Sequence, residues 1–172
     1  MRNTILPIQP THGADIDQLT IATEDPRAED SLALLDEMTE FSILTYPEDA
    51  ENGITLATPV DLERGVFVIA RLGGWPAGIC AVLEHPPVDG EPAMELKRMY
   101  VRKEARGRRI AEHMLCWLEI QARIRGARKI ALLCGPRQPS ALRLYERCGY
   151  SVRGAFGKYQ THPLSIFFEK RL

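Results

Sequence analysis

The pattern of apolar and polar positions predicts a strand followed by a helix early in the chain. Leu19 and Ile21 alternate with polar neighbours, as in a short strand. Between Ala28 and Tyr46, apolar residues recur at roughly the spacing of a helix, with Asp25 as a candidate N-terminal cap and Pro47 as the stop. The chain therefore opens with a β-α unit.

Two flanking segments lack a clear period. Residues 1–13 carry prolines at positions 7 and 10, which indicates an N-terminal extension or an added edge strand. Residues 48–63 are polar and irregular, and they predict a loop with a short helix near residues 59–62. We expect residues 14–172 to form a single domain.

The middle of the chain predicts three consecutive strands. Val66–Arg71 and Ala77–Leu83 are apolar runs on either side of a Gly-Gly pair, which is typical of a hairpin. A turn at residues 86–90 leads into a third strand, Met94–Val101. Strict alternation along this strand would place Met94, Leu96, Arg98 and Tyr100 on one face, and Glu95, Lys97, Met99 and Val101 on the other.

The second half of the chain alternates helices and strands. A 3–4 spacing of apolar residues predicts a helix over Ile110–Arg125, and the apolar run Lys129–Cys134 predicts a central strand. A shorter helix, Ser140–Cys148, and two last strands, at residues 150–155 and 164–170, complete the order. This order predicts an α/β (α+β) fold, a mixed sheet with helices on both faces.

Composition narrows the class of protein. The 172 residues carry a formal net charge of −1, so there is no global positive field for nucleic acid, and no apolar run approaches a membrane span. The four cysteines fall within apolar patterns and form no CxxC pair, which favours reduced, buried thiols in a cytoplasmic protein and argues against a zinc site.

A basic turn is the clearest candidate for a binding site. Residues 106–111 (RGRRIA) lie between the third predicted strand and the first long helix of the second half. The N–H groups of a helix's first turn lack partners within the helix, and the helix dipole adds positive potential there. Such a turn is a natural site for an anion such as a pyrophosphate group.

Two motifs in residues 15–172 resemble the GCN5-related N-acetyltransferase (GNAT) superfamily. The segment ELKRMYVRKEARGRRIAEHML, from Glu95, is similar to its acetyl-CoA pyrophosphate motif, Gln/Arg-x-x-Gly-x-Gly/Ala. The segment SALRLYERCGY, from Ser140, is similar to its later motif, Ala-x-x-Leu-Tyr-x-x-x-Gly-Phe/Tyr. Arg109 replaces the usual central glycine and Gln138 replaces an asparagine that often precedes the second motif. We expect a helical φ at Arg109, with its guanidinium turned outward or onto phosphate.

The resemblance implies a mostly antiparallel sheet of six or seven strands, splayed between the fourth and fifth, within a single acetyltransferase domain. It implies acetyl transfer from acetyl-CoA to a primary amine, on a small molecule or a peptide, by direct attack in a ternary complex, without a metal. The cofactor-binding residues it implies are Met99, Tyr100, Val101, Arg106, Gly107, Arg108, Arg109, Ile110, Ala111, Gln138, Ser140 and Arg143.

Two residues are candidates for the chemistry. Glu95 matches a strand glutamate that acts as a base in some members, although a simple ion pair with Lys97 or Arg98 is the alternative. Tyr145 matches a tyrosine that faces the sulfur of CoA as an acid, and a packed core tyrosine is the alternative.

Other functions stay open at this point. A non-catalytic acyl-CoA sensor would need the basic turn but neither Glu95 nor Tyr145. A nucleic-acid binder would use the basic side chains between positions 97 and 109, although the chain as a whole is slightly acidic. The oligomeric state is open, and a homodimer is allowed.

Overall fold

The computed structural model describes residues 18–48, 64–157 and 165–172. Its elements are β1 (Leu19–Thr23), α1 (Glu29–Thr45), β2 (Gly65–Leu72), β3 (Trp75–Val88), β4 (Glu91–Val101), the 3-10 turn η3 (Lys103–Ala105), α3 (Ile110–Ile124), β5 (Lys129–Cys134), α4 (Pro139–Arg147), β6 (Ser151–Arg153) and β7 (Ile166–Arg171). The predicted N-terminal extension and the predicted short helix near residues 59–62 lie outside the described residues.

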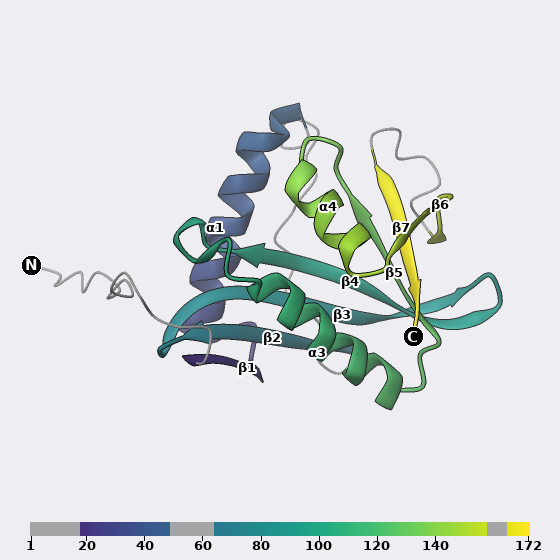
Figure 1. Cartoon of the computed structure of the whole chain (residues 1–172), viewed down its shortest axis with the longest axis horizontal. Helices are drawn as coiled ribbons and strands as arrows, with labels where there is room; N and C mark the ends of the chain where they lie inside the picture. Colours follow the sequence, from purple (N-terminus) through teal and green to yellow (C-terminus); the bar gives the residue numbers. More distant parts are fainter. Residues whose placement is uncertain (1–17, 49–63, 158–164) are drawn as a thin grey trace, which may run out of the picture.

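One seven-stranded sheet, in the order β1-β2-β3-β4-β5-β7-β6, organises the fold. All neighbouring strands are antiparallel except β4 and β5, which are parallel. Figure 1 shows α1 on one side of this sheet and α3 and α4 on the other. The predicted mixed sheet with helices on both faces is confirmed.

Alternation along β2 explains the two layers of core. Val66 and Val68 pack with α3 and α4, whereas Phe67 and Ile69 pack with Leu34 of α1. All five side chains are buried, so both faces of this strand are covered. The short, apolar β2 therefore reads as a nearly continuous hydrophobic run rather than as a half-polar strand.

The sheet opens between β4 and β5. The two strands pair only at three positions, the last of which joins Glu95 to Ala131. Beyond that pair, β4 continues to Val101 and β5 to Cys134 without pairing, and Figure 1 shows the two strands diverging. This is the splay expected between the fourth and fifth strands.

A bulge at Arg98 overturns the predicted faces of β4. Ile79 pairs with Tyr100 and Ala81 pairs with Lys97, so β4 carries one residue more than β3 here, and Arg98 has a φ of 59°. An extra residue reverses the alternation beyond it. Met99 and Val101 therefore join the α3 side with Met94 and Leu96, whereas Tyr100 joins the α1 side.

Two smaller expectations were also wrong. The N-cap of α1 is Ala28, not Asp25, because the Asp25 carboxylate accepts the N–H of Arg27 in the turn before the helix. The cysteines are all free thiols, but only Cys80 and Cys134 are buried, and Cys116 is exposed on α3. Apolar residues lie on the exposed face of α3 as well as on its buried face, and the sequence pattern did not distinguish the two faces.

Candidate functional site

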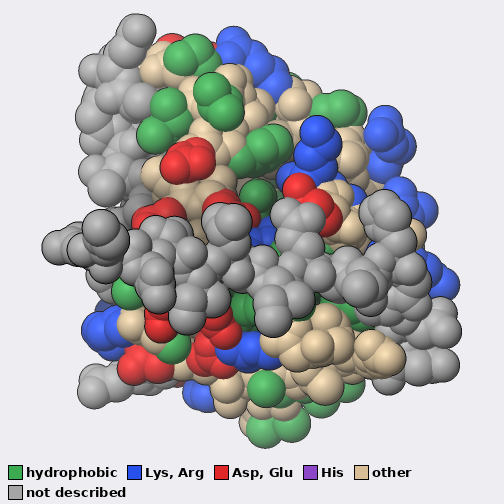
Figure 2. Space-filling model, turned by 90° about the vertical axis from the view of Figure 1, so that its left-hand side faces the viewer, with side chains coloured by type: hydrophobic (Ala, Val, Ile, Leu, Met, Phe, Trp, Pro, Cys, Tyr) green, Lys and Arg blue, Asp and Glu red, His purple; other side chains and the backbone are tan. Residues whose placement is uncertain are grey.

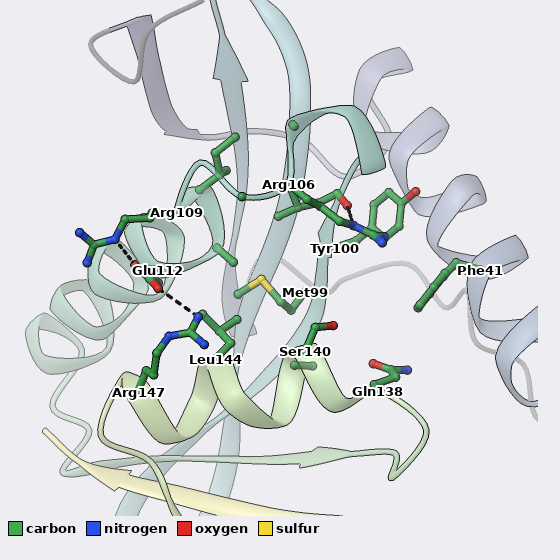
Figure 3. Close-up of a pocket in the computed structure, with 16 residues that line it drawn as sticks. Phe41, Met99, Tyr100, Arg106, Arg109, Glu112, Gln138, Ser140, Leu144 and Arg147 are labelled. Atoms are coloured by element: carbon green, nitrogen blue, oxygen red, sulfur yellow. Dashed lines mark hydrogen bonds and ion pairs between the residues drawn. The ribbon is translucent and has the colours of Figure 1, made fainter.

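A cavity of about 320 Å³ opens beside the splay, between the ends of β4, α3 and α4. Its walls come from α1, the end of β4, the turn into α3, the first turn of α3 and one face of α4, as Figure 3 shows. The lining residues are Phe41, Met99, Tyr100, Val101, Ala105, Arg106, Gly107, Arg109, Ile110, Ala111, Glu112, Gln138, Ser140, Ala141, Leu144 and Arg147. Segments far apart in the sequence thus share one pocket.

The turn between β4 and α3 forms the polar end of the cavity. Gly107 has a φ of 79°, and Arg109, the N-cap of α3, has a φ of 60° and a ψ of 17°. The helical φ predicted for Arg109 is therefore wrong. Arg109 adopts the left-handed conformation that a glycine would adopt without strain, so the usual glycine of the motif would also fit this backbone.

The first turn of α3 brings unpaired backbone N–H donors to the cavity wall. The N–H of His113 donates to the carbonyl oxygen of Arg109 over 3.1 Å, so Arg109 carries the first carbonyl of the α3 ladder. The N–H groups of Ile110, Ala111 and Glu112, one turn earlier, have no carbonyl four residues back within the helix. The positive end of α3 and these donors meet in the cavity wall.

Arg106 joins the turn to α1. Its Nε donates to the carbonyl oxygen of Val101 over 3.0 Å, and its guanidinium lies 5.4 Å from the centre of the Phe41 ring. Phe41 itself lines the cavity, so this cation–π contact forms part of its wall. The end of the cavity near α1 is therefore cationic and aromatic.

Glu112 lies between two arginines at the other end of the cavity. Its carboxylate pairs with Nε of Arg109, three residues before it, and accepts from Nη2 of Arg147 on α4 over 3.2 Å. The hydrogen bond from Arg109 holds the pKa of the Glu112 carboxyl below its usual value, with a further contribution from Arg147. The Arg109 side chain is 78% exposed, so it turns outward and does not fill the cavity.

The α4 wall combines polar and apolar groups. Gln138 is the N-cap of α4, and its carbonyl oxygen accepts from the N–H groups of Ala141 and Leu142. Gln138 and Ser140 give polar groups to the wall, and Ala141 and Leu144 belong to the same apolar cluster as Met99 of β4. Figure 3 shows Leu144 on the side of α4 that faces Met99. The cavity is thus polar at its ends and apolar between them.

Ten of the twelve predicted cofactor-binding residues line this cavity; Arg108 and Arg143 do not. Glu112, Arg147 and Phe41 line it without having been predicted. The sequence could have indicated Arg147, because Ser140, Leu144 and Arg147 are spaced four and seven residues apart and such positions share one face of a helix. No sequence signal points to Phe41, whose contact with Arg106 joins α1 to the turn before α3.

The two candidate catalytic residues lie outside the cavity wall. Glu95 is the last residue of β4 that pairs with β5, it is 5% exposed, and its carboxylate lies 2.9 Å from Nζ of Lys97. Because Glu95 pairs across the sheet with Leu83, which packs on the α1 side, its side chain faces away from α3 and α4. It stands at the vertex of the splay, on the face opposite the cavity.

Tyr145 is buried in α4, next to the cavity-lining Leu144. Its ring packs against Tyr150 and Phe168 with centroid distances of 5.8 Å to each. Burial raises the pKa of its hydroxyl well above the usual value, so it stays protonated at neutral pH. A protonated hydroxyl can donate a proton to a base that comes within hydrogen-bond reach.

The predicted basic run does not form one surface. Lys97 pairs with Glu95, Arg102 is buried against Glu37, and Arg109 pairs with Glu112. On the face that Figure 2 shows, acidic and basic side chains are interspersed. Among the described residues there is no group of His, Cys, Asp and Glu side chains that could hold a metal ion, and no helix long and apolar enough to cross a membrane.

Comparison with known proteins decides the family. Residues 31–150 match the family model described as the Acetyltransferase (GNAT) family. The chain belongs to the GNAT family. A relative of this GNAT acetyltransferase, an IAA acetyltransferase from Azospirillum brasilense, is 34% identical over 158 residues, which cover 90% of this chain and 98% of the relative.

Solved structures agree with the fold. A Klebsiella pneumoniae protein assigned to the acyl-CoA N-acyltransferases has a TM-score of 0.69 and 29% identity, over 90% of this chain and 97% of that one. A Bacillus subtilis acetyltransferase in complex with CoA has a TM-score of 0.63 and 18% identity, over 90% and 99% of the two chains. The GNAT fold predicted from the two motifs is confirmed, and CoA is a ligand of proteins with this fold.

Proposed function

We propose that this GNAT acetyltransferase transfers the acetyl group of acetyl-CoA to a primary amine by direct attack in a ternary complex. The observation that carries the proposal is the cavity beside the splay. It combines a cationic turn, the backbone donors of α3 and an apolar middle in the order that a phosphate-bearing thioester needs. Acetyl-CoA supplies the activated acetyl group.

The residues present fit this cosubstrate. The turn from Arg106 to Ala111 would hold the pyrophosphate through backbone N–H groups, in an arrangement that the left-handed Arg109 preserves. Met99, Tyr100 and Val101 at the end of β4, together with Gln138 and Ser140, would line the path of the pantetheine arm. Arg108 and Arg143 belong to the proposed set on the motif alone.

The amine would approach from the opposite face of the sheet, through the splay. A lysine-like amine has a pKa of about 10.4, so removing its proton at pH 7 costs roughly 4–5 kcal/mol. Glu95 lies at the vertex of the splay on that face and is proposed as the base, directly or through water. Backbone N–H groups of β4 beyond Glu95, which β5 does not engage, are suited to stabilise charge on the thioester oxygen.

Tyr145 is proposed as the acid that protonates the leaving thiolate. Its raised pKa keeps the proton on the hydroxyl at neutral pH, where a thiolate of pKa about 8.5 would otherwise leave as an anion. Because the hydroxyl of Tyr145 has a higher pKa than the thiol of CoA, proton transfer from Tyr145 to the thiolate is unfavourable by itself. Its contribution therefore depends on a close approach of the sulfur to α4.

The test is release of free thiol from acetyl-CoA across a panel of amines, with IAA added because the Azospirillum relative is named for it. We expect turnover with at least one primary amine and a large loss of turnover in Glu95→Gln. The matched control is Glu84→Gln, which removes the same charge at an exposed position of β3. Tight CoA binding without turnover on any acceptor would instead favour the acyl-CoA sensor.

A further inference from the structure

Glu112 places a carboxylate in a wall that is otherwise built for anions. It is the third residue of α3, its side chain is 20% exposed, and it lines the cavity together with Arg109 and Arg147. Figure 3 shows the two guanidinium groups reaching this carboxylate from α3 and α4. It is the one acidic side chain in the cavity wall formed by the described residues.

The position is favourable for any anion, and Glu112 already uses it. A negative charge in the first turn interacts well with the positive end of a helix. The same carboxylate bridges two guanidinium groups that would otherwise repel each other across the gap between α3 and α4. It therefore makes contacts of the kind that a phosphate group would make there.

We infer that Glu112 is a built-in counter-ion of the cofactor site, which holds Arg109 and Arg147 in place and gives them up to a phosphate group of the ligand. The inference rests on the proposed function, because it assumes that the cavity takes a phosphate-bearing thioester. Once the ligand is bound, the carboxylate of Glu112 stays beside it and repels its negative charge. Glu112 thus lowers the affinity of the site for every anionic ligand.

In this arrangement the two arginines respond only to the phosphate-bearing part of the ligand. A CoA thioester brings enough negative charge to replace the carboxylate at both arginines. A thioester of pantetheine alone, which lacks the phosphates, leaves the arginines on Glu112 and gains nothing from them. Arg109, which stands where a glycine is usual in the family motif, acquires a role of its own in this arrangement.

The opposite role for Glu112 makes an opposite prediction. If the carboxylate only orients the two arginines for the ligand, its removal loosens them and weakens CoA binding. If it competes with the ligand, its removal strengthens binding, and the gain disappears when salt supplies competing anions. The sign of the change in affinity therefore separates the two roles.

The experiment is calorimetric titration of CoA into the wild type, Glu112→Gln and the control Glu104→Gln, each at low and high NaCl. Glu104 is an exposed residue of η3 outside the cavity wall, so its loss changes the charge equally. We expect Glu112→Gln to bind CoA about fivefold more tightly at low salt, with a steeper loss of affinity as salt rises, and Glu104→Gln to change little.

A second variant keeps the test independent of the first. Arg147→Gln should weaken CoA binding about tenfold and leave binding of pantetheine unchanged, because only the phosphate-bearing ligand uses the guanidinium. Equal or weaker CoA binding by Glu112→Gln would overturn the counter-ion role while the wild type still binds CoA. A wild type that binds no CoA would overturn the proposed function itself, and the inference with it.

Discussion

The hydroxyl oxygen of Tyr46 occupies the place of the side chain that Gly135 lacks. A Cβ on Gly135 would lie 2.0 Å from this oxygen, far inside contact distance. The same hydroxyl accepts the backbone N–H of Arg137 over 2.9 Å, and the Arg137 guanidinium donates to the carbonyl oxygen of Thr45 over 3.0 Å. The end of α1 is thereby fastened to the loop between β5 and α4.

Replacing Gly135 by alanine should therefore displace Tyr46 and break this fastening. We expect a loss of about 1–3 kcal/mol in the free energy of unfolding, from the forced shift and the lost hydrogen bond. Urea unfolding of Gly135→Ala, Tyr46→Ala and the double variant measures it. The alanine at position 135 should cost much less once the Tyr46 ring is gone, and additive costs would contradict the proposed clash.

Arg109 offers a test of backbone strain at the start of α3. With a φ of 60°, the residue holds a conformation that costs a side-chain-bearing residue about 1 kcal/mol relative to glycine. Arg109→Gly and Arg109→Ala both remove the ion pair with Glu112, but only glycine removes the strain. We expect the glycine variant to be more stable than the alanine variant by about 1 kcal/mol in urea unfolding. Equal stabilities would show that the turn adapts to alanine without cost.

The order of elements could be read from the sequence because each change of period marks a real element. The strand β2, the apolar β5 and the two long helices lie close to their predicted bounds, whereas β3 runs on to Val88, past its predicted end at Leu83 and into the predicted turn at residues 86–90. The opening of the sheet was predicted from the family resemblance and not from the pattern of apolar and polar residues, because no residue type in β4 or β5 marks where their pairing stops. A family motif carried this part of the prediction.

Positions set by single backbone angles could not be predicted. The bulge at Arg98 reverses the faces of Met99 and Tyr100, and alternation has no signal for one extra residue. The left-handed Arg109 is likewise contrary to its residue type. Phe41 reaches the cavity through a contact between distant segments, which local patterns do not encode.

Tyr145→Phe tests the proposed acid. We expect the turnover number to fall by about a hundredfold, while the affinity for CoA stays within about twofold, because proton donation matters only in the transition state. Burial raises the pKa of Tyr145 well above its usual value. The turnover number of the wild type should therefore not decrease through deprotonation of Tyr145 as the pH rises to about 10.

The matched control for Tyr145 is Tyr150→Phe. This neighbour packs against Tyr145, and its buried hydroxyl has no hydrogen-bond partner within the described part of the chain. Tyr150→Phe should leave the turnover number nearly unchanged, because it removes a similarly buried hydroxyl but keeps Tyr145, the proposed acid. Similar losses in both variants would mean that the ring packing, and not the proton, supports turnover.

A cluster of carboxylates around the buried Lys129, outside the cavity wall, should contribute to acid stability. Lys129 is 2% exposed in β5, and its amino group lies 3.4 Å, 3.2 Å and 3.4 Å from carboxylate oxygens of Asp89, Glu91 and Glu169. A hydrogen bond from Arg153, with a smaller contribution from Lys129, holds the pKa of Asp89 below its usual value, and the ammonium group of Lys129, 3.2 Å away, does the same for Glu91.

The sign of the pH dependence follows from these lowered values. Because the unfolded chain binds protons at these carboxyls more readily than the folded one, their contribution is complete above the unfolded values, near pH 4–5. It is lost as pH falls through the lower folded values. The melting temperature should therefore stay level from pH 8 to about 5 and fall below that.

The double variant Asp89→Asn with Glu91→Gln should have a lower melting temperature than the wild type at pH 7. Its melting temperature should also fall less than that of the wild type as the pH is lowered. The control is Asp36→Asn with Glu40→Gln, two exposed carboxylates of α1 that form none of the ion pairs recorded between described residues, and it should keep the wild-type slope. Melting followed by circular dichroism between pH 3 and 8 measures all three. If the cluster variant keeps the full wild-type slope, acid unfolding originates elsewhere, and the charges around Lys129 serve only to satisfy its buried amino group.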